Sequence, residues 1–308
     1  MDFFSYLFGH NLFRLFSPGF SRAFLIFYMF SVIGWICEVL YVGIFFEHRF
    51  VNRGGLFGPL CPVYGFGGIL ILTLPKELQS PVWVLFISGL VFCSAVEYAA
   101  GYVLEKLFHT KWWDYSSKKI VIRGKTIPLH LHGRICLLNS TLFGIMTVCV
   151  IDFVHPLFRI LLNSMQVVVV QTVASGIGFM LFLDVAFSVH RLVDFNVYIT
   201  RLKDLADSLK DRYGAEDWFA GKSLLESLDY IHRLASAKQE KFSESFIQKI
   251  HEARARHRTA ESFVKKFPSM KNPANAESLL LIREKIQKRL DEKRLLRLEN
   301  KSSAKKIR

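Results

Sequence analysis

Apolar residues form long, nearly uninterrupted runs over the first 190 positions, and a helical alternation of apolar and polar positions follows. Five of the runs are long enough to cross about 30 Å of hydrocarbon at roughly 20 residues each. The pattern predicts an all-α integral membrane protein with about five transmembrane helices and a cytosolic helical tail. The expected spans lie near residues 23–46, 56–74, 82–104, 135–155 and 166–190.

The second run is the shortest, and it begins in a stretch that is rich in helix breakers. Residues 52–65 contain four glycines and two prolines beside an asparagine and an arginine. Such residues interrupt helices and let backbones approach closely. Irregular backbone at membrane depth is tolerated only where it is buried in protein or lines a cavity. We therefore expect the edge of a site here, in either a full span or a re-entrant half-span.

The flanking segments carry different patterns. Residues 1–22 mix aromatic and polar positions with a break at Gly9, which is typical of an interfacial amphipathic segment. Residues 23–190 form the predicted transmembrane domain, and residues 191–308 form a predicted basic cytosolic domain. Apolar stripes of helical period support that domain, at Phe195, Ile199, Leu202, Leu205 and Leu209, at Leu224, Leu228 and Ile231, at Phe242, Phe246 and Ile250, and at Leu279, Ile282, Ile286 and Leu290.

Charge gives these segments an orientation. Of 40 Lys and Arg residues, 27 lie in the tail, and those of the membrane domain gather in the connections after the first and third spans. The positive-inside bias places these connections and the carboxyl terminus in the cytoplasm and the amino terminus outside, in a multi-pass protein of the cell membrane. The basic run at Arg254, Arg256 and Arg258 favours contact with anionic lipids of the bilayer over nucleic acid, because no stacking aromatics accompany it.

Motifs exclude several classes of protein. Five cysteines are scattered among apolar segments without a CxxC pair, which argues against a disulfide framework, and no removable signal peptide is evident. P-loop, G-x-S-x-G, H-E-x-x-H and dinucleotide motifs are absent from the sequence. We therefore assign no enzyme class and expect no cofactor. If the chain serves a transport system driven by ATP, a separate ATPase must supply the hydrolysis.

Three carboxylates fall inside apolar runs, at Glu38, Glu97 and Asp184. A charge there costs on the order of 3 kcal/mol by insertion scales, so each is a candidate functional residue. The alternative is that each is neutralised by a proton or by an arginine and only fixes helix packing. Arg53 and Arg134 are the candidate counterions, because both lie at span edges on the same predicted side.

The third connection offers further polar candidates. Trp112 is expected to anchor the span at the interface, whereas Asp114 is expected to pair with an arginine or bind a cation. His130 and His132 stand two positions apart, which suits a strand or a loop, and no full ligand set accompanies them. We therefore expect no metal site.

Several short motifs lie between residues 25 and 160. They are Gly34-Trp35 with Glu38, Asn52-Arg53-Gly54, Gly58-Pro59, Pro62, Tyr64-Gly65, Glu97-Tyr98, Leu104-Glu105, Trp113-Asp114-Tyr115, Gly133-Arg134-Ile135-Cys136-Leu137 and His155-Pro156. Together they resemble the ABC-transporter type IV family of bacterial membrane proteins, the CmpB-like permeases. The chain departs from that family at His130 and His132, where asparagines are usual, and in the longer segment 118–127.

The resemblance implies a permease-like subunit of a transport system for a small solute or lipid, working as a homo-oligomer or within a membrane complex. A membrane-embedded enzyme or lipid-head-group-binding protein is the first alternative, and a scaffold that recruits cytosolic partners through the tail is the second. The expected substrate or ion site lies at the inner face of the membrane. Its candidate residues are Glu38, Asn52, Arg53, Gly54, Gly58, Pro59, Tyr64, Glu97, Trp113, Asp114, Tyr115 and Arg134.

Overall fold

The computed structural model describes residues 16–44, 50, 52–122, 125–213, 230, 248 and 260–306. Most of the interfacial segment expected at 1–22, the tail stripes from Leu224 to Ile250 and the basic run at 254–258 lie outside the described residues. The chain divides into two compact units. One comprises Met1–Leu107 and Trp112–Arg191, and the other comprises Phe108–Lys111 and Leu192–Arg308.

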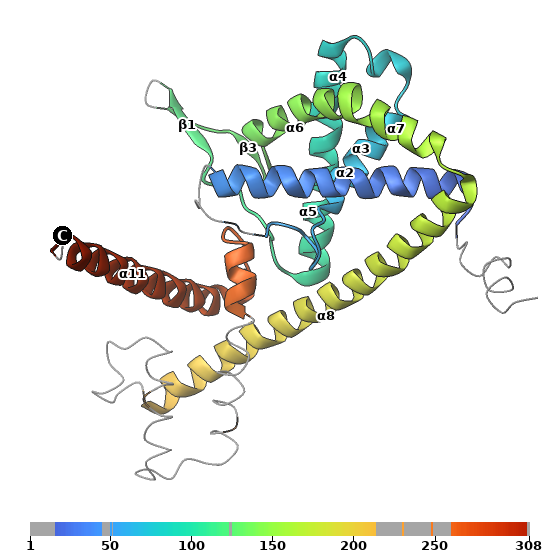
Figure 1. The fold of residues 1–308 in the computed structure, drawn as a ribbon. Helices are drawn as coiled ribbons and strands as arrows, with labels where there is room; N and C mark the ends of the chain where they lie inside the picture. The colour runs from blue at the N-terminus through green and yellow to red at the C-terminus, as the bar shows by residue number, and fades with distance from the viewer. Residues whose placement is uncertain are drawn as a thin grey trace, which may run out of the picture. The chain divides into compact units, whose positions relative to one another are not determined.

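Four helices in the described part of the chain are long and apolar enough to cross a membrane, namely Pro18–Val42, Val82–Phe108, Leu137–Ser164 and Val167–Asp211. The first is α2, and the last lies in α8 (Val167–Tyr213), which runs as one continuous helix (Figure 1). The other two combine shorter elements: α4 (Val82–Ser88), η4 (Gly89–Cys93) and α5 (Ser94–Phe108), then α6 (Leu137–Cys149), η5 (Val150–Val154) and α7 (His155–Ser164). The protein is therefore an all-α membrane protein, as its sequence pattern predicts.

The second expected span takes a different form. Its only long helix is α3 (Pro62–Thr73), which has 12 residues and is thus about 18 Å long, too short to cross the hydrocarbon alone. Pro62 opens this helix, and the residues from 52 to 61 form neither helix nor strand. The glycines and Pro59 in that stretch disfavour helix, so the helical part of this segment begins only at Pro62. A short 3-10 turn, η3 (Lys76–Leu78), follows it.

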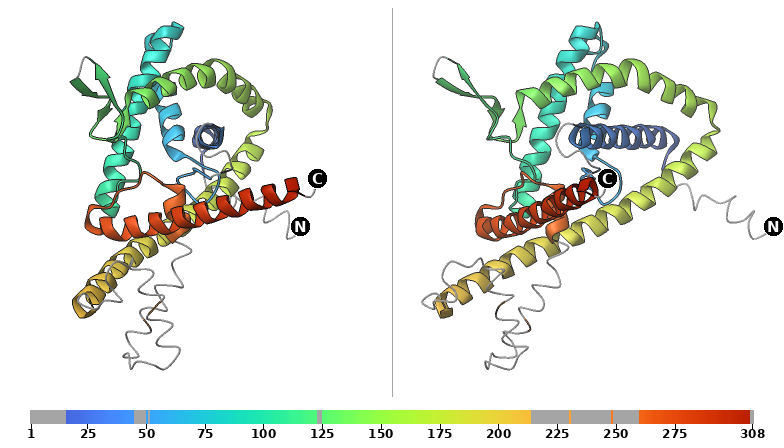
Figure 2. Two further views of the ribbon diagram at one scale, coloured as in Figure 1. Left: turned by 90° about the vertical axis from the view of Figure 1, so that its left-hand side faces the viewer. Right: turned by 60° about the vertical axis from the view of Figure 1, so that its left-hand side comes forward.

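The contacts between α3 and α2 show how far along the membrane-crossing helix α2 the irregular segment lies. The two helices pack side by side (Figure 2), and the backbone N–H of Cys61 donates to the carbonyl of Ser31, near the middle of α2, at 3.0 Å. The contacts of α3 stay near the middle of α2, since Cys61 meets Ser31, Tyr64 meets Gly34 and Gly68 meets Phe30, so the two helices cross there. Asn52, at the start of the irregular stretch, binds Trp35 of α2. Residues 52–61 therefore lie beside the carboxyl-terminal half of α2, with irregular backbone.

Both composite spans contain a π-helical turn, η4 in one and η5 in the other. Such wide turns are rare and occur frequently at functional sites. The turn η5 directly precedes His155 and Pro156, and the wider π-helical turn accommodates the proline and its missing N–H inside a continuous helix. The helix consequently continues to Ser164, whereas the sequence suggested an end near residue 155.

The connection between α5 and α6 contains the strands of the first unit. β1 (Lys119–Ile122) pairs antiparallel with β2 (Lys125–Pro128), and Ile120 stands opposite Ile127. β3 (His130–Leu131) pairs with β4 (Ile135–Cys136), which leads directly into α6. These two small ribbons fix the residues around Arg134 at the end of a span.

The second unit has its own core. It contains the carboxyl-terminal part of α8, a helical segment at 260–266, η6 (Pro273–Asn275) and α11 (Ala276–Lys306). Its buried apolar residues include the predicted stripe in α8 and the first two positions of the predicted stripe in α11: Phe195, Ile199, Leu202, Leu205, Leu209, Leu279 and Ile282. A buried polar group supports the core, because Asn272 donates to Thr110 Oγ1 at 2.8 Å and accepts from the N–H of Asn275 at 3.0 Å.

Candidate functional site

Asn52 organises the start of the irregular segment. Its Oδ1 accepts from the indole N–H of Trp35 on α2 at 2.8 Å and from the backbone N–H of Gly54 at 3.0 Å. Its Nδ2 donates to the carbonyl of Phe57 at 3.3 Å. One amide side chain thus satisfies backbone groups that a helix would have paired internally. Arg53 follows directly, and its carbonyl accepts from the thiol of Cys61 at 3.7 Å.

Asp184 of α8 secures the middle of the same segment. Its Oδ1 accepts from the backbone N–H of Phe57 at 2.9 Å, and its Oδ2 accepts from the N–H of Gly58 at 3.0 Å. Ser188, one turn further along α8, also accepts from the N–H of Phe57 and donates to Asp184. A side chain at position 58 would meet Asp184, because a Cβ there would lie 2.8 Å from Oδ2. This carboxylate therefore caps two backbone donors that no helix pairs.

Glu38 lies on α2 and is bound by α3. The hydroxyl of Tyr64 donates to Glu38 Oε1 at 2.7 Å. The tyrosine ring packs against Gly34, where a Cβ would come within 2.2 Å of the ring carbon Cγ. Glycine at position 34 is thus what allows Tyr64 to reach Glu38.

Glu97 lies on α5 and is 6% exposed. Its Oε1 accepts from the hydroxyl of Tyr115 at 3.1 Å, and Asn139 of α6 donates to the same hydroxyl oxygen at 2.6 Å. Among the described residues, Glu97 Oε2 is buried without a hydrogen-bond partner. Burial raises the pKa of Tyr115 well above 10.0, and the charges of Glu97 and Glu38 raise this pKa further, so Tyr115 remains a donor at neutral pH.

The two glutamates converge on one face of α6. Asn139 binds Tyr115, and Phe143, one turn further along, packs edge-on against the ring of Tyr64 with 5.6 Å between centroids. Residues four apart on a helix are neighbours about 6 Å apart. Ser94 and Ser140 join α5 to the same region of α6 by a buried hydrogen bond of 2.7 Å. We call Glu38, Tyr64, Glu97, Tyr115 and Asn139 the carboxylate–tyrosine cluster.

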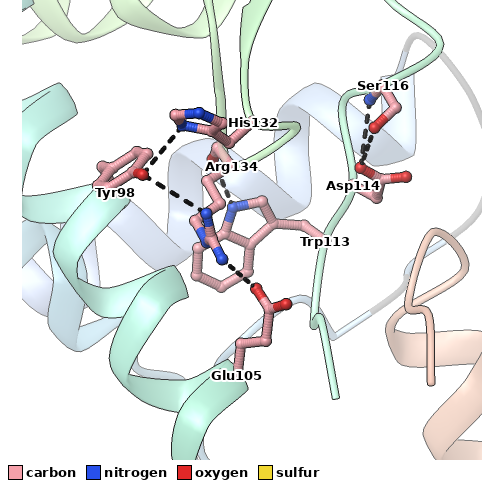
Figure 3. A network of polar contacts seen from close by, with 7 residues as sticks. All are labelled: Tyr98, Glu105, Trp113, Asp114, Ser116, His132 and Arg134. Carbon is pink, nitrogen blue, oxygen red and sulfur yellow. Dashed lines mark hydrogen bonds and ion pairs between the residues drawn. The ribbon is translucent and has the colours of Figure 1, made fainter. Parts of the chain in front are cut away.

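Arg134 lies in a separate network at the end of α5 (Figure 3). Its Nη2 forms an ion pair of 2.6 Å with Glu105, and its guanidinium lies 5.4 Å and 5.5 Å from the ring centroids of Tyr98 and Tyr102. The indole N–H of Trp113 donates to the carbonyl of Arg134 at 2.8 Å. Glu105 is thus the acidic partner of Arg134, and the sequence reasoning did not foresee that pairing.

Asp114 does not join this network. Figure 3 shows Trp113 directed toward Arg134 and Asp114 directed away from it. The carboxylate of Asp114 accepts from the hydroxyl of Ser116 at 2.6 Å and closes a local turn. It also lies against Gly133, which has a positive φ of 71°, so a side chain at that position would be strained and obstructed. Asp114 thereby shapes the loop.

The two histidines of this connection take part in local contacts. His132 Nδ1 lies 3.0 Å from the hydroxyl of Tyr98, and His130 Nδ1 accepts from the N–H of Gly133 at 3.2 Å. In the described part of the chain, no group of three or more His, Cys, Asp or Glu side chains is arranged to hold a metal ion.

A small cavity of about 40 Å³ adjoins the cluster, with room for a few water-sized molecules. It lies between α2, α3, the η4 turn and α6, and its walls are almost entirely apolar. Tyr64 is the cluster residue that lines it, with Phe143, Cys93 and Thr147 among the other walls. The ring of Tyr64 thus separates this apolar space from Glu38.

The sequence-predicted candidates therefore fall into three groups. Asn52, Arg53, Gly54, Gly58 and Pro59 belong to the irregular segment, Glu38, Tyr64, Glu97 and Tyr115 to the carboxylate–tyrosine cluster, and Trp113, Asp114 and Arg134 to the connection after α5. The predicted site omitted Asp184, Glu105 and Asn139. Of these, Asp184 carried a detectable signal, since it is a carboxylate within an apolar run, whereas Glu105 and Asn139 look like ordinary polar positions at helix ends.

Comparison with known proteins identifies a family. The sequence model of the family described as "Putative ABC-transporter type IV" matches residues 25–189. This range contains every candidate site residue. Neither the curated proteins nor the solved structures give a match.

Proposed function

This chain belongs to the ABC-transporter type IV family, and from that membership we propose that it is a permease-like subunit for a small solute or a lipid. The observation that carries the proposal is the irregular segment 52–61, which lies beside the carboxyl-terminal half of a membrane-crossing helix. Transporters place their sites where a membrane helix is discontinuous, so that helix ends and irregular backbone line the site. Such backbone is costly in lipid unless it lines a site.

The carboxylate–tyrosine cluster supplies the polar groups of the proposed site. Glu38 and Glu97 come from two different helices and converge on α6 through Tyr64 and Tyr115. Intramembrane carboxylates facing the interior of a bundle mark pathways for ions and solutes more often than they mark lipid contacts. We propose that the irregular segment and this cluster together form the site.

The orientation follows from charge. The irregular segment and α3 together traverse the membrane once, so their direction is that of a full span, and the positive-inside bias puts Arg53, Arg134 and the tail at the cytoplasmic face of the cell membrane. The site then opens toward the cytoplasm. A single chain has few spans for a complete transporter, so we propose that it works as a homo-oligomer or with other membrane subunits, and that a separate ATPase drives any ATP-dependent step.

The contacts of Arg134 disfavour the alternative in which this residue binds a lipid head group. A phosphate clamp needs a guanidinium that can turn toward its ligand. Arg134 is 15% exposed at its side chain and holds Glu105 at 2.6 Å. A phosphate would have to displace that carboxylate.

Vesicle reconstitution tests the proposal. The full chain is placed in vesicles loaded with a defined mixture of amino acids, sugars and nucleosides, and solute exchange is followed by mass spectrometry. A parallel arm follows flipping of a fluorescently labelled phosphatidylethanolamine, which separates solute from lipid movement. We expect a flux that Glu38→Gln reduces at least about tenfold and that Glu77→Gln, a change at an exposed carboxylate, leaves unchanged.

Two other outcomes would point elsewhere. If no solute and no lipid moves, and none of these solutes raises the unfolding temperature of the protein, the permease proposal fails. If function in cells tolerates Glu38→Gln and Arg134→Lys but is lost on deletion of residues 191–308, the scaffold reading gains support. The separate core of the second unit is the observation that favours that reading.

A further inference from the structure

Glu97 has an oxygen whose position requires an explanation. The residue is 6% exposed, and Oε2 is buried without a partner among the described residues, while Oε1 is bound by Tyr115. Buried polar atoms are nearly always paired, because an unpaired one loses its bonds to water and gains nothing in return. An ionised carboxylate in this position would be worse placed than a neutral one. The unpaired Oε2 is therefore the atom of Glu97 at which a proton or another cation would bind.

In the part of the chain that the structure describes, the groups that face Glu97 provide no such cation. The titratable groups from the packed elements are Glu38 of α2, Tyr64 of α3, Tyr115 of the connection and Cys136 at the start of α6. Each of these is neutral or negative in its ordinary states. Of the nearby basic residues, Lys118 interacts electrostatically with Cys136, and Arg134 forms an ion pair with Glu105.

The second carboxylate is close enough to matter. Glu38 raises the cost of ionising Tyr115, the same hydroxyl that binds Glu97. The two tyrosines that bind the glutamates also meet α6 within one helical turn, at Asn139 and Phe143. Like charges placed near each other in a protein interior favour the state in which one of them is protonated. For these two acids, the state with one proton on the pair is therefore favoured over the state with none.

We propose that Glu38 and Glu97 form a proton-binding site, in which Glu97 holds the proton on Oε2 and Glu38 is the ionised partner. This inference rests on the proposed function and deepens it, because it names the proton as a ligand of the proposed site. Binding of the proton neutralises Glu97, and its release to water leaves a pair of like charges. The alternating charge gives the site two states of different polarity next to the irregular segment.

Infrared spectroscopy of the full chain in lipid nanodiscs tests the proposal directly. A protonated carboxyl group has a C=O stretch separate from the amide and carboxylate bands. We expect such a band in the wild-type protein at neutral pH, its loss at alkaline pH, and its absence at neutral pH in Glu97→Gln. Glu77→Gln, which changes an exposed carboxylate, keeps the band. A wild-type protein without the band at neutral pH, or a Glu97→Gln variant that retains it, overturns the proposal.

A labelling experiment needs no variant and so does not depend on how well Glu97→Gln folds. Dicyclohexylcarbodiimide reacts with protonated carboxyl groups in apolar surroundings, and we expect its adduct at Glu97 in the wild-type peptide map. Raised pH should abolish labelling. Protection by sodium at constant pH, or an adduct absent from Glu97, rejects a proton site.

The experiments can reject the proton site and the permease function independently of each other. Labelled Glu97 without any flux of solute or lipid keeps the proton site and rejects the permease. Flux that depends on Glu38, with Glu97 unlabelled and no protonated-carboxyl band, keeps the permease and rejects the proton site.

Discussion

The carboxylate of Asp184 accepts hydrogen bonds from the adjacent backbone N–H groups of Phe57 and Gly58, which lie 127 and 126 positions earlier in the chain. One side chain on α8 thus holds the irregular segment in place. Arg191, two turns further along α8, lies over the ring of Phe57 at 5.5 Å and adds a second contact to the same loop.

Asp184→Asn should loosen this attachment. The amide keeps one acceptor oxygen but turns an NH₂ group toward one of the two backbone donors. We expect a loss of about 1.5–3 kcal/mol in the free energy of unfolding, the usual range for a hydrogen bond to a charged group. Denaturant unfolding of the purified protein measures it. Asp152→Asn, at an exposed carboxylate in η5, is the matched control and should have little effect, and equal effects of the two variants would contradict the assignment.

The ion pair between Arg134 and Glu105 should behave as a coupled unit. Arg134→Gln leaves Glu105 uncompensated in a partly buried place, and Glu105→Gln does the same to Arg134. We expect each single change to destabilise the protein and the double change to restore part of the loss, with a coupling energy of roughly 1–3 kcal/mol. A double-mutant cycle measures this energy, and additive losses would show that the pair does not act together.

Gly34→Ala should separate α2 from α3. The added Cβ would lie 2.2 Å from Cγ of Tyr64, so the ring must move and its hydroxyl must leave Glu38. Overpacking of this kind costs typically about 1–3 kcal/mol. Gly176→Ala in α8 is the control, because a Cβ there meets no atom within 4 Å, and we expect it to be neutral or slightly stabilising. Thermal unfolding of both variants decides the point.

Tyr115→Phe should change the response of the protein to alkaline pH. The pKa of Tyr115 is raised in the folded state above its ordinary value of 10.0, so the folded state keeps a proton that the unfolded state releases above about pH 10. The stability contributed by Tyr115 is therefore present below pH 10 and declines as pH rises beyond it. Tyr115→Phe also loses the hydrogen bonds to Glu97 and Asn139.

Unfolding curves of the wild type and Tyr115→Phe at neutral and alkaline pH test this directly. The variant should be less stable at neutral pH, and the difference between the two proteins should shrink as pH rises above about 10. A difference that stays constant with pH would mean that the raised pKa of Tyr115 is not linked to folding.

Sequence pattern predicts the fold class because long apolar runs leave few alternatives to membrane-crossing helices. The helical stripe from Phe195 to Leu209 likewise predicts the core of the second unit, since a period of 3.6 residues places those positions on one face. The ends of elements were less predictable. α8 continues past residue 190 because no glycine or proline stops it there, and α6 continues into α7 because a π-helical turn accommodates Pro156.

The candidate site was predictable in its residue types and not in its pairings. Glu38 and Glu97 are conspicuous because carboxylates are rare in apolar runs, and residues 52–65 are conspicuous for their glycines. The partners are a matter of three-dimensional packing. Nothing local to Asp184 indicates Phe57, and nothing local to Arg134 distinguishes Glu105 from Asp114.

The π-helical turn η4 gives the span from Val82 to Phe108 one spare residue. An α-helix turns by about 100° per residue, so removal of one residue normally rotates everything beyond it. A π-helical turn can absorb that removal by becoming an α-turn, with both flanks facing as before. Deletion of Val91 should therefore leave Glu97 facing Tyr115, whereas deletion of Val103, in the regular part of α5, should swing Glu105 away from Arg134. Protein yield and the Glu105–Arg134 coupling energy measure the difference between the two deletions. Among its described residues, the span can therefore lose a residue at one place only, the π-helical turn, without rotating its two flanks.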